Sequence, residues 1–131
     1  MHWLWLRWFQ PVVLGFGLGI LAMVLHEAGH LAAATALGVR VKRIGIQWNK
    51  GLFTVRERGT VRQNLIIALA GPSVNLLLIA VKPWFPMFSL ANLCCVAANM
   101  LPIEGSDGFR VADCWRQIRE ASSNEVKGGD R

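Results

Sequence analysis

Three long apolar stretches alternate with shorter polar segments along the chain. The first spans residues 11–38, and its only charged or titratable side chains are His26, Glu27 and His30. The other two span residues 63–81 and 84–103. A helix rises about 1.5 Å per residue and a bilayer's hydrocarbon core is about 30 Å thick, so each stretch has or approaches the length of a membrane span. The pattern predicts an α-helical membrane protein with three transmembrane helices.

Between the first two stretches, residues 40–58 alternate apolar and polar side chains around Asn49-Lys50-Gly51. This alternation predicts a small β-hairpin at the membrane interface. Pro72 and Pro102 are expected to kink or unwind the second and third spans. Irregular backbone at membrane depth persists only where it is buried in protein or lines a wet cavity, so these prolines point to a site between the helices.

The C-terminal part of the chain is more polar. Apolar residues recur at helical spacing over residues 108–121, which predicts an amphipathic helix, and the polar tail over residues 122–131 is expected to be frayed or disordered. With 131 residues the chain has room for one domain. We therefore expect residues 1–121 to form a single membrane-embedded core.

Composition and charge placement support the membrane class and suggest an orientation. Hydrophobic residues make up 53% of the chain and charged residues 17%, compared with about 45–50% and about 25% in ordinary soluble domains. The net charge of +6 would suit a nucleic-acid binder, but Lys and Arg gather between residues 40 and 62 and after residue 108, as in the inner loops of membrane proteins. We therefore expect no nucleic-acid partner. Because Lys and Arg concentrate on the cytoplasmic side of membrane proteins, we also expect the N-terminus outside and the C-terminus in the cytoplasm.

The chemistry-bearing motif lies inside the first apolar stretch. His26-Glu27-Ala28-Gly29-His30 is an H-E-x-x-H pattern, which on a helix puts both imidazoles on one face, close enough to share a metal. Zinc suits such ligands, and Glu27 beside them could act as general base. The alternative is a chance pattern or a pair of hydrogen-bonded histidines. A carboxylate at the centre of a span costs about 2.5–3.5 kcal/mol, which disfavours that alternative.

A catalytic zinc site needs a third protein ligand, which should come from another span at similar depth. Asp107 follows Pro102 and is flanked by Gly105 and Gly108, so the backbone around it can open and present its carboxylate inward. Glu104 is the second, less favoured carboxylate.

Three motifs together resemble the site-2 protease family of intramembrane zinc metalloproteases. They are HEAGH in the first span, Ala70-Gly71-Pro72-Ser73-Val74-Asn75 in the second, and Asn99, Pro102, Asp107 and Gly108 in the third. The resemblance covers roughly residues 11–120 and corresponds to a minimal three-helix core. Ser106 and Phe109 depart from the family pattern, which usually has leucine and glycine there.

The resemblance implies a role for each matching residue. It implies one Zn2+ per chain held by His26, His30 and Asp107, with Glu27 as catalytic base. Asn99 would help to position substrate or stabilise the oxyanion. Asn75 would do similar work or tie helices together by an interhelical hydrogen bond.

The predicted function is hydrolysis of peptide bonds in transmembrane segments of other membrane proteins, as in regulated intramembrane proteolysis. The alternative is a non-catalytic pseudoprotease that binds metal or holds substrate. The expected partners are a transmembrane-helix substrate and the lipid bilayer, and pairing with a second copy or a regulatory membrane partner stays open. The hairpin either receives the unwound substrate as an added strand or only seals the inner face.

Overall fold

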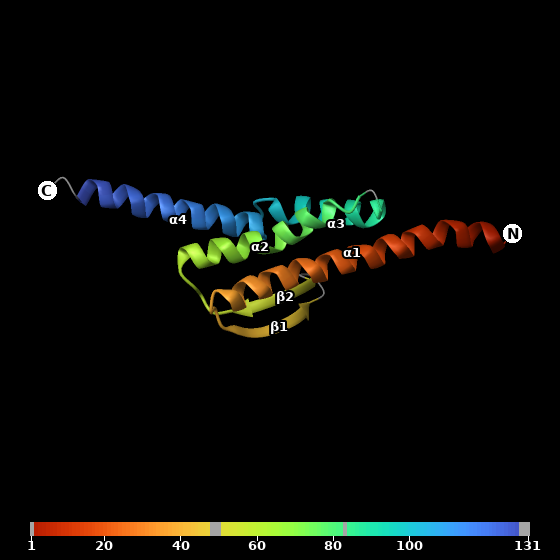
Figure 1. The fold of residues 1–131 in the computed structure, drawn as a ribbon, viewed down its shortest axis with the longest axis horizontal. Helices are drawn as coiled ribbons and strands as arrows, with labels where there is room; N and C mark the ends of the chain where they lie inside the picture. The colour runs from red at the N-terminus through yellow and green to blue at the C-terminus, as the bar shows by residue number, and fades with distance from the viewer. Residues whose placement is uncertain (1, 48–50, 83, 129–131) are drawn as a thin grey trace.

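The computed structural model describes residues 2–47, 51–82 and 84–128, which form four helices and a two-stranded sheet. In chain order these are α1 (His2–Ala36), β1 (Val41–Gln47), β2 (Gly51–Arg56), α2 (Val61–Ile79), α3 (Pro86–Met100) and α4 (Asp107–Gly128). Helix α2 contacts each of the other three helices (Figure 1). The two termini lie at opposite ends of the long axis in Figure 1. The predicted mainly helical fold with a hairpin between the first two apolar helices is confirmed.

Helix α1 ends in a glycine-dependent turn that feeds the hairpin. Gly38 has a φ of +69°, in the left-handed region that favours glycine. Its N–H donates to the carbonyl of Thr35 at 3.1 Å, and the N–H of Val39 donates to the carbonyl of Ala34 at 2.9 Å. This Schellman arrangement satisfies two of the last carbonyls of the helix and turns the chain into β1. At its other end, α1 begins at His2 and so extends beyond the predicted start at residue 11.

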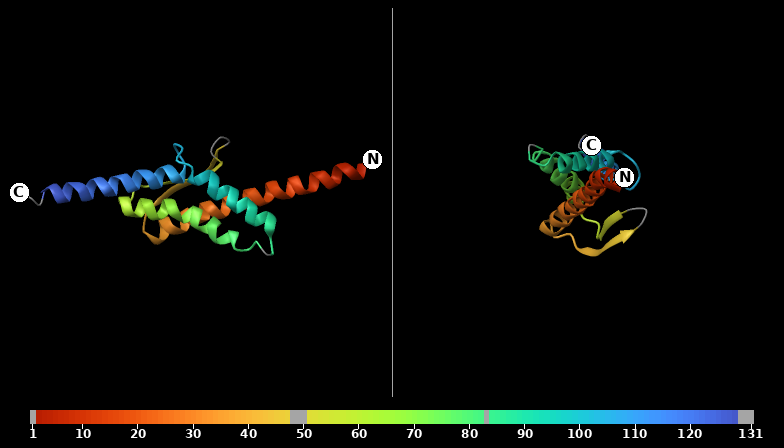
Figure 2. Two further views of the ribbon diagram at one scale, coloured as in Figure 1. Left: turned by 90° about the horizontal axis from the view of Figure 1, so that it is seen from above. Right: turned by 90° about the vertical axis from the view of Figure 1, so that its right-hand side faces the viewer.

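Strands β1 and β2 pair in antiparallel register, from Val41 opposite Arg56 to Gln47 opposite Gly51. The predicted turn residues Asn49 and Lys50 lie outside the described residues. In the end-on view of Figure 2 the hairpin stands to one side of the helices, and β2 contacts α1. The hairpin is thereby held next to the H-E-x-x-H turns of α1.

Helix α2 starts at a capping box and continues through its proline. The hydroxyl of Thr60 accepts a bond from the N–H of Gln63 at 3.2 Å, and the Gln63 side chain accepts from the N–H of Thr60 at 2.8 Å. The Gln63 amide also donates to the carbonyl of Leu37, which ties the start of α2 to the end of α1. Pro72 lies inside the helix, which continues to Ile79, so the unwinding considered for this stretch does not occur. A proline removes only one backbone hydrogen-bond donor, so the helix can continue on both sides of it. Pro72 is also buried.

The third apolar stretch forms a shorter helix than expected. Helix α3 has 15 residues and ends at Met100, because Leu101 precedes Pro102 and is extended, with φ −63° and ψ 135°. At about 1.5 Å per residue it is roughly 22 Å long, less than the ~30 Å hydrocarbon core. Among the described residues, two helical segments are long and apolar enough to cross a membrane, namely Phe9–Ala36 and Val61–Ile79. The expected third transmembrane helix over residues 84–103 is therefore not confirmed.

Helix α4 is longer than the predicted amphipathic segment of residues 108–121. It continues to Gly128, so the disorder expected for the polar tail is wrong over residues 122–128, whereas residues 129–131 lie outside the described part. Once a helix has started, each further residue adds one hydrogen bond at little extra entropy, and the segment contains no proline. Polarity alone was therefore a poor indicator of disorder here.

Several polar side chains are buried between the helices, whereas many large apolar side chains are exposed. Only 17% of the most apolar window of α1 and 28% of that of α2 are buried, too little for core helices of a soluble protein. The buried polar residues include His26, His30, Asn75, Asn92 and Asp107. This arrangement is the reverse of a soluble fold and suits helices surrounded by lipid.

Glycine allows α1 and α2 to cross closely at the H-E-x-x-H motif. A Cβ added at Gly29 would lie 2.8 Å from Cγ2 of Val74 and 2.9 Å from the carbonyl oxygen of Ala70. Both distances are shorter than real Cβ contacts, and the second involves rigid backbone. We conclude that Gly29 sets the separation of these two helices.

This crossing predicts a stability effect for Gly29→Ala. The helices must separate to admit the methyl group, so we expect the free energy of unfolding in detergent to fall by about 1–3 kcal/mol. Gly19→Ala is the matched control, because nothing lies within 4 Å of a Cβ there. Alanine is the better helix former, so the control should be neutral or slightly stabilising. Equal losses in the two variants would contradict the close crossing.

Candidate metal centre

Three acceptor atoms from distant parts of the chain converge at the helix crossing. Nε2 of His26 and Nε2 of His30 lie 2.9 Å and 3.0 Å from Oδ2 of Asp107, and the two nitrogens are 3.1 Å apart. His26 is 2% exposed and Asp107 5%. Asp107, which the sequence favoured over Glu104, therefore lies against both histidines, whereas Glu104 is exposed.

The outer nitrogen of each imidazole is bonded to a fixed acceptor. Nδ1 of His30 donates to the carbonyl of Ile67 in α2 at 2.6 Å. Nδ1 of His26 lies 3.0 Å from Oδ1 of Asn75, whose Nδ2 donates to two acceptors, the carbonyl of Ala22 and Oδ1 of Asn92. The oxygen of Asn75 therefore faces His26 and accepts its Nδ1 proton. In the neutral form of each imidazole the proton is therefore on Nδ1, which leaves Nε2 as the nitrogen that can bind a metal; both Nε2 atoms are directed at Asp107.

This set of atoms fits a zinc ion. The three atoms lie close enough to one another to bind a single cation, and imidazole nitrogen and carboxylate oxygen are ligand types that zinc takes. Outer-shell bonds to Asn75 and to the Ile67 carbonyl are the kind that orient ligating histidines in zinc sites. His26, His30 and Asp107 are therefore the residues that would hold the metal.

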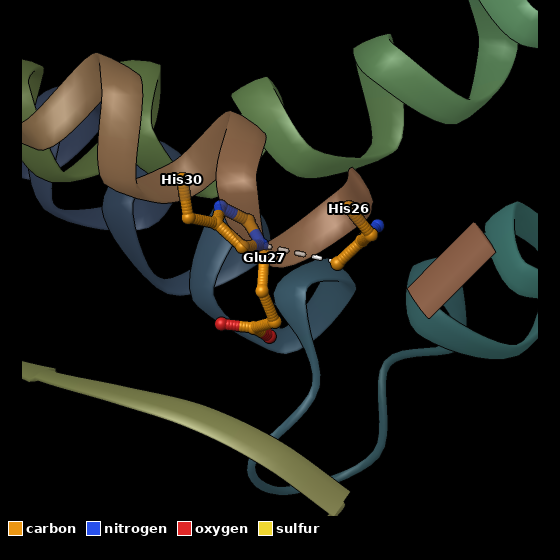
Figure 3. Close-up of side chains that lie close together, drawn as sticks. All are labelled: His26, Glu27 and His30. Atoms are coloured by element: carbon orange, nitrogen blue, oxygen red, sulfur yellow. Dashed lines mark hydrogen bonds between the residues drawn. The ribbon is translucent and has the colours of Figure 1, made fainter. Parts of the chain in front are cut away.

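Glu27 is turned away from this triangle. Its carboxylate and the histidine nitrogens lie within 4.8 Å of one another, so it too could be considered a ligand. Figure 3 shows the carboxylate pointing from α1 toward the neighbouring strand, and Oγ1 of Thr54 in β2 donates to it at 3.2 Å. Asp107 is in direct contact with both Nε2 atoms, so it would be the third ligand of a bound metal, and Glu27 would be available as a base.

Local chain geometry explains how Asp107 reaches the histidines. After α3 the chain reverses over residues 101–106, using Gly105 with a φ of +93°. Ser106 then caps α4, because its hydroxyl accepts from the N–H of Phe109 at 3.1 Å. Gly108 is needed because a Cβ there would lie 2.6 Å from the carbonyl carbon of Met100. The departure from the family pattern at Ser106 is thus a helix cap.

Gly71 in α2 makes room for the imidazoles. A Cβ at this position would lie 2.6 Å from Cε1 of His30 and 2.8 Å from Nε2 of His26. Any larger residue would push the ring nitrogens off their convergence point. The glycine of the second motif therefore serves the metal centre by the space it leaves.

A cavity of about 980 Å³ opens beside the centre. Glu27, His30 and Asp107 line it together with Asn99 of α3, Thr54 of β2 and the first turns of α2 and α4. Half-buried Arg56 also lines it and donates to Oδ1 of Asn64 at 2.7 Å. Burial and the nearby Arg110 lower the pKa of Arg56, and the guanidinium stays charged at neutral pH. The cavity thus offers a polar, water-accessible approach to the histidines.

The two motif asparagines occupy different environments. Asn75 is fully buried behind His26, where it also ties α2 to α1. Asn99 lines the cavity, and its Nδ2 donates to the carbonyl of Cys95 in its own helix at 3.0 Å. Of these two asparagines, Asn99 is therefore in a position to contact a molecule in the cavity, whereas Asn75 contacts the ring of His26.

Three groups around the centre were missed from the sequence. The Ile67 carbonyl and the Thr54 hydroxyl become partners of His30 and Glu27 only through the tertiary fold, so no sequence signal identifies them. Asn92 had a usable signal, because an asparagine within an apolar helix usually has a buried partner.

Comparisons with known proteins agree with this chemistry. A family model described as peptidase M50B-like matches residues 2–101, which include the H-E-x-x-H motif but not Asp107. Stage IV sporulation protein FB of Bacillus subtilis is 28% identical over 105 residues, covering 70% of this chain and 36% of the relative. A Synechocystis sp. protein with the provisional name zinc metalloprotease is 38% identical over 72 residues, covering 52% of this chain and 19% of the relative. The chain therefore spans well under half the length of either relative.

Removal of the third ligand tests the centre. Asp107→Asn keeps the size of the side chain but removes its charge, so zinc affinity should fall by more than about 100-fold, beyond the ~10–100-fold cost of losing an outer-shell partner. Zinc competition with a chromophoric chelator in detergent measures this. Glu104→Gln, the neighbouring carboxylate on the cavity, should leave the affinity unchanged. If zinc affinity instead falls in Glu104→Gln and not in Asp107→Asn, Glu104 and not Asp107 is the third ligand.

Substitution of Asn75 and of Asn99 should have different effects on zinc affinity in the same assay. Asn75→Ala leaves the Nδ1 proton of His26 without its acceptor, so we expect zinc affinity to fall about 10–100-fold. Asn99→Ala should bind zinc as the wild type does, because its amide bonds within its own helix. Similar zinc constants for all three proteins would contradict the positioning role of Asn75.

Proposed function

Since the chain belongs to the peptidase M50B-like family, we propose that it is a zinc metalloendopeptidase that cleaves peptide bonds in membrane-spanning segments of other proteins. The observation that carries this proposal is the convergence of His26, His30 and Asp107 beside Glu27 at the wall of a cavity. Two helices long and apolar enough to cross a membrane support an intramembrane location for this chemistry.

In the proposed hydrolysis, each residue of the site has a different role. Zinc, when bound, polarises the scissile carbonyl and stabilises the negative charge that develops on its oxygen. Glu27 accepts a proton from the attacking water, whose oxygen bonds to the carbonyl carbon. The carbon–nitrogen bond then breaks, and Glu27 passes the proton to the leaving amine. Thr54 orients the carboxylate of Glu27 for both transfers.

Asn99 and β2 would hold the substrate in the cavity. A helical segment must unwind before cleavage, because its carbonyls are engaged in its own hydrogen bonds. Strand β2 pairs with β1 on one edge, and the cavity runs along Thr54, Val55 and Arg56 of β2. We propose that the unwound segment adds to this strand and that the side-chain amide of Asn99 contacts its backbone.

The proposed orientation is a multi-pass protein with its N-terminus outside and its C-terminus in the cytoplasm. The opposite positions of the two termini along the long axis support it (Figure 1). The concentration of Lys and Arg in the hairpin, in the segment before α2 and in α4 supports the assignment of that end to the cytoplasmic side.

Replacement of the general base tests the mechanism. In Glu27→Gln we expect zinc per chain to stay at the wild-type level while cleavage of a transmembrane reporter in detergent falls about 10²–10⁴-fold. Glu120→Gln, an exposed carboxylate on α4, should cleave as the wild type does. Undiminished cleavage by zinc-loaded Glu27→Gln would refute the mechanism. Zinc binding without cleavage in the wild type would favour a pseudoprotease.

A further inference from the structure

A chain of buried amides runs from α3 to the metal centre. Asn92 in α3 and Asn75 in α2 are both fully buried, with 0% exposure, in helices whose other residues are mostly apolar. Nδ2 of Asn75 donates to Oδ1 of Asn92 at 3.0 Å, and Oδ1 of Asn75 lies 3.0 Å from Nδ1 of His26. Asn92 is thus two hydrogen bonds from a candidate zinc ligand.

Each amide in this chain can take only one orientation. Nδ2 of Asn92 donates to the carbonyl of Phe88 in its own helix at 2.8 Å, so its oxygen faces Asn75. That oxygen and the carbonyl of Ala22 are both acceptors, so the NH2 group of Asn75 must face them. The Asn75 oxygen is thereby left for His26, and a flipped amide would put oxygen against oxygen at both contacts.

We propose that Asn92 is a positioning residue of the metal centre, which holds the Asn75 amide in the orientation that keeps Nε2 of His26 free for zinc. This inference rests on the zinc site of the proposed function and adds α3 to the elements that build it. Without Asn92, only the Ala22 carbonyl opposes the flipped amide. In the flipped state an N–H of Asn75 faces Nδ1 of His26 and favours the tautomer whose Nε2 carries the proton.

The inference predicts that loss of Asn92 weakens zinc binding, and that this effect depends on the presence of Asn75. Asn92→Leu, similar in size but without an acceptor, should weaken zinc binding about threefold to tenfold, less than the ~10–100-fold expected for direct partners of a ligand. Asn92→Ala, which adds no new branched group, should behave alike. In an Asn75→Ala background, Asn92→Leu should cause no further loss, because the bond it removes is already gone.

Ser89→Ala is the matched control for α3. Ser89 is also a buried polar residue on the same helix. Its hydroxyl donates to the carbonyl of Ile79 at 2.9 Å and makes no bond to Asn75 or His26. Its loss should lower the unfolding temperature without changing the zinc constant.

The possible results separate this inference from the proposed function. Wild-type zinc affinity in both Asn92 variants, an equal loss in Ser89→Ala, or an additive loss in the double variant would each overturn the positioning role. The zinc constants need no protease assay, so failure of the wild type to cleave would reject the proposed function alone. A wild type that binds no zinc would reject both.

Discussion

The contact of two imidazole nitrogens with one carboxylate oxygen is the constraint around which this bundle is built. His26 and His30 lie on α1, and Asp107 follows them by 81 and 77 positions in the chain. Their meeting requires α1 and α2 to cross closely, α3 to end early and α4 to start at a defined point. Glycines serve two of these requirements: Gly29 and Gly71 allow the close crossing, and Gly108 allows the start of α4. Each leaves out a side chain that would separate atoms of the site.

A second constraint follows from surrounding this contact with apolar helices. A buried polar group without a partner costs several kcal/mol in hydrocarbon, so each must be satisfied internally. Every buried side-chain nitrogen and oxygen among the described residues has a hydrogen-bond partner. The partners extend outward from the histidines through Asn75 and Ile67, and the first of these paths reaches α3 through Asn92. The same bonds therefore satisfy the buried polar groups and fix the orientation of the two histidine rings.

Much of this arrangement could be predicted from the sequence, and the misses have physical causes. The helices, the hairpin and the zinc-binding pattern follow from local periodicity and i, i+4 spacing, and family membership confirms the resemblance to site-2 proteases. Hydropathy could not predict that α3 ends at Met100, because the apolar run continues to Ile103 while the backbone conformation is decided by Pro102. It also could not separate the roles of Asn75 and Asn99, which differ only in whether the tertiary fold directs them to a histidine or to the cavity.

The early end of α3 links the fold to the chemistry. Had the helix continued through residue 107, Asp107 would lie about 10 Å further along its axis than Met100, at ~1.5 Å per residue. Instead, the chain turns back over residues 101–106, and α4 starts with Asp107 against both histidines. The same turn brings Glu104 and Gly105 to the wall of the cavity beside Glu27. The early end of α3 thus allows Asp107 to reach the histidines, and the turn that follows it forms part of the cavity wall.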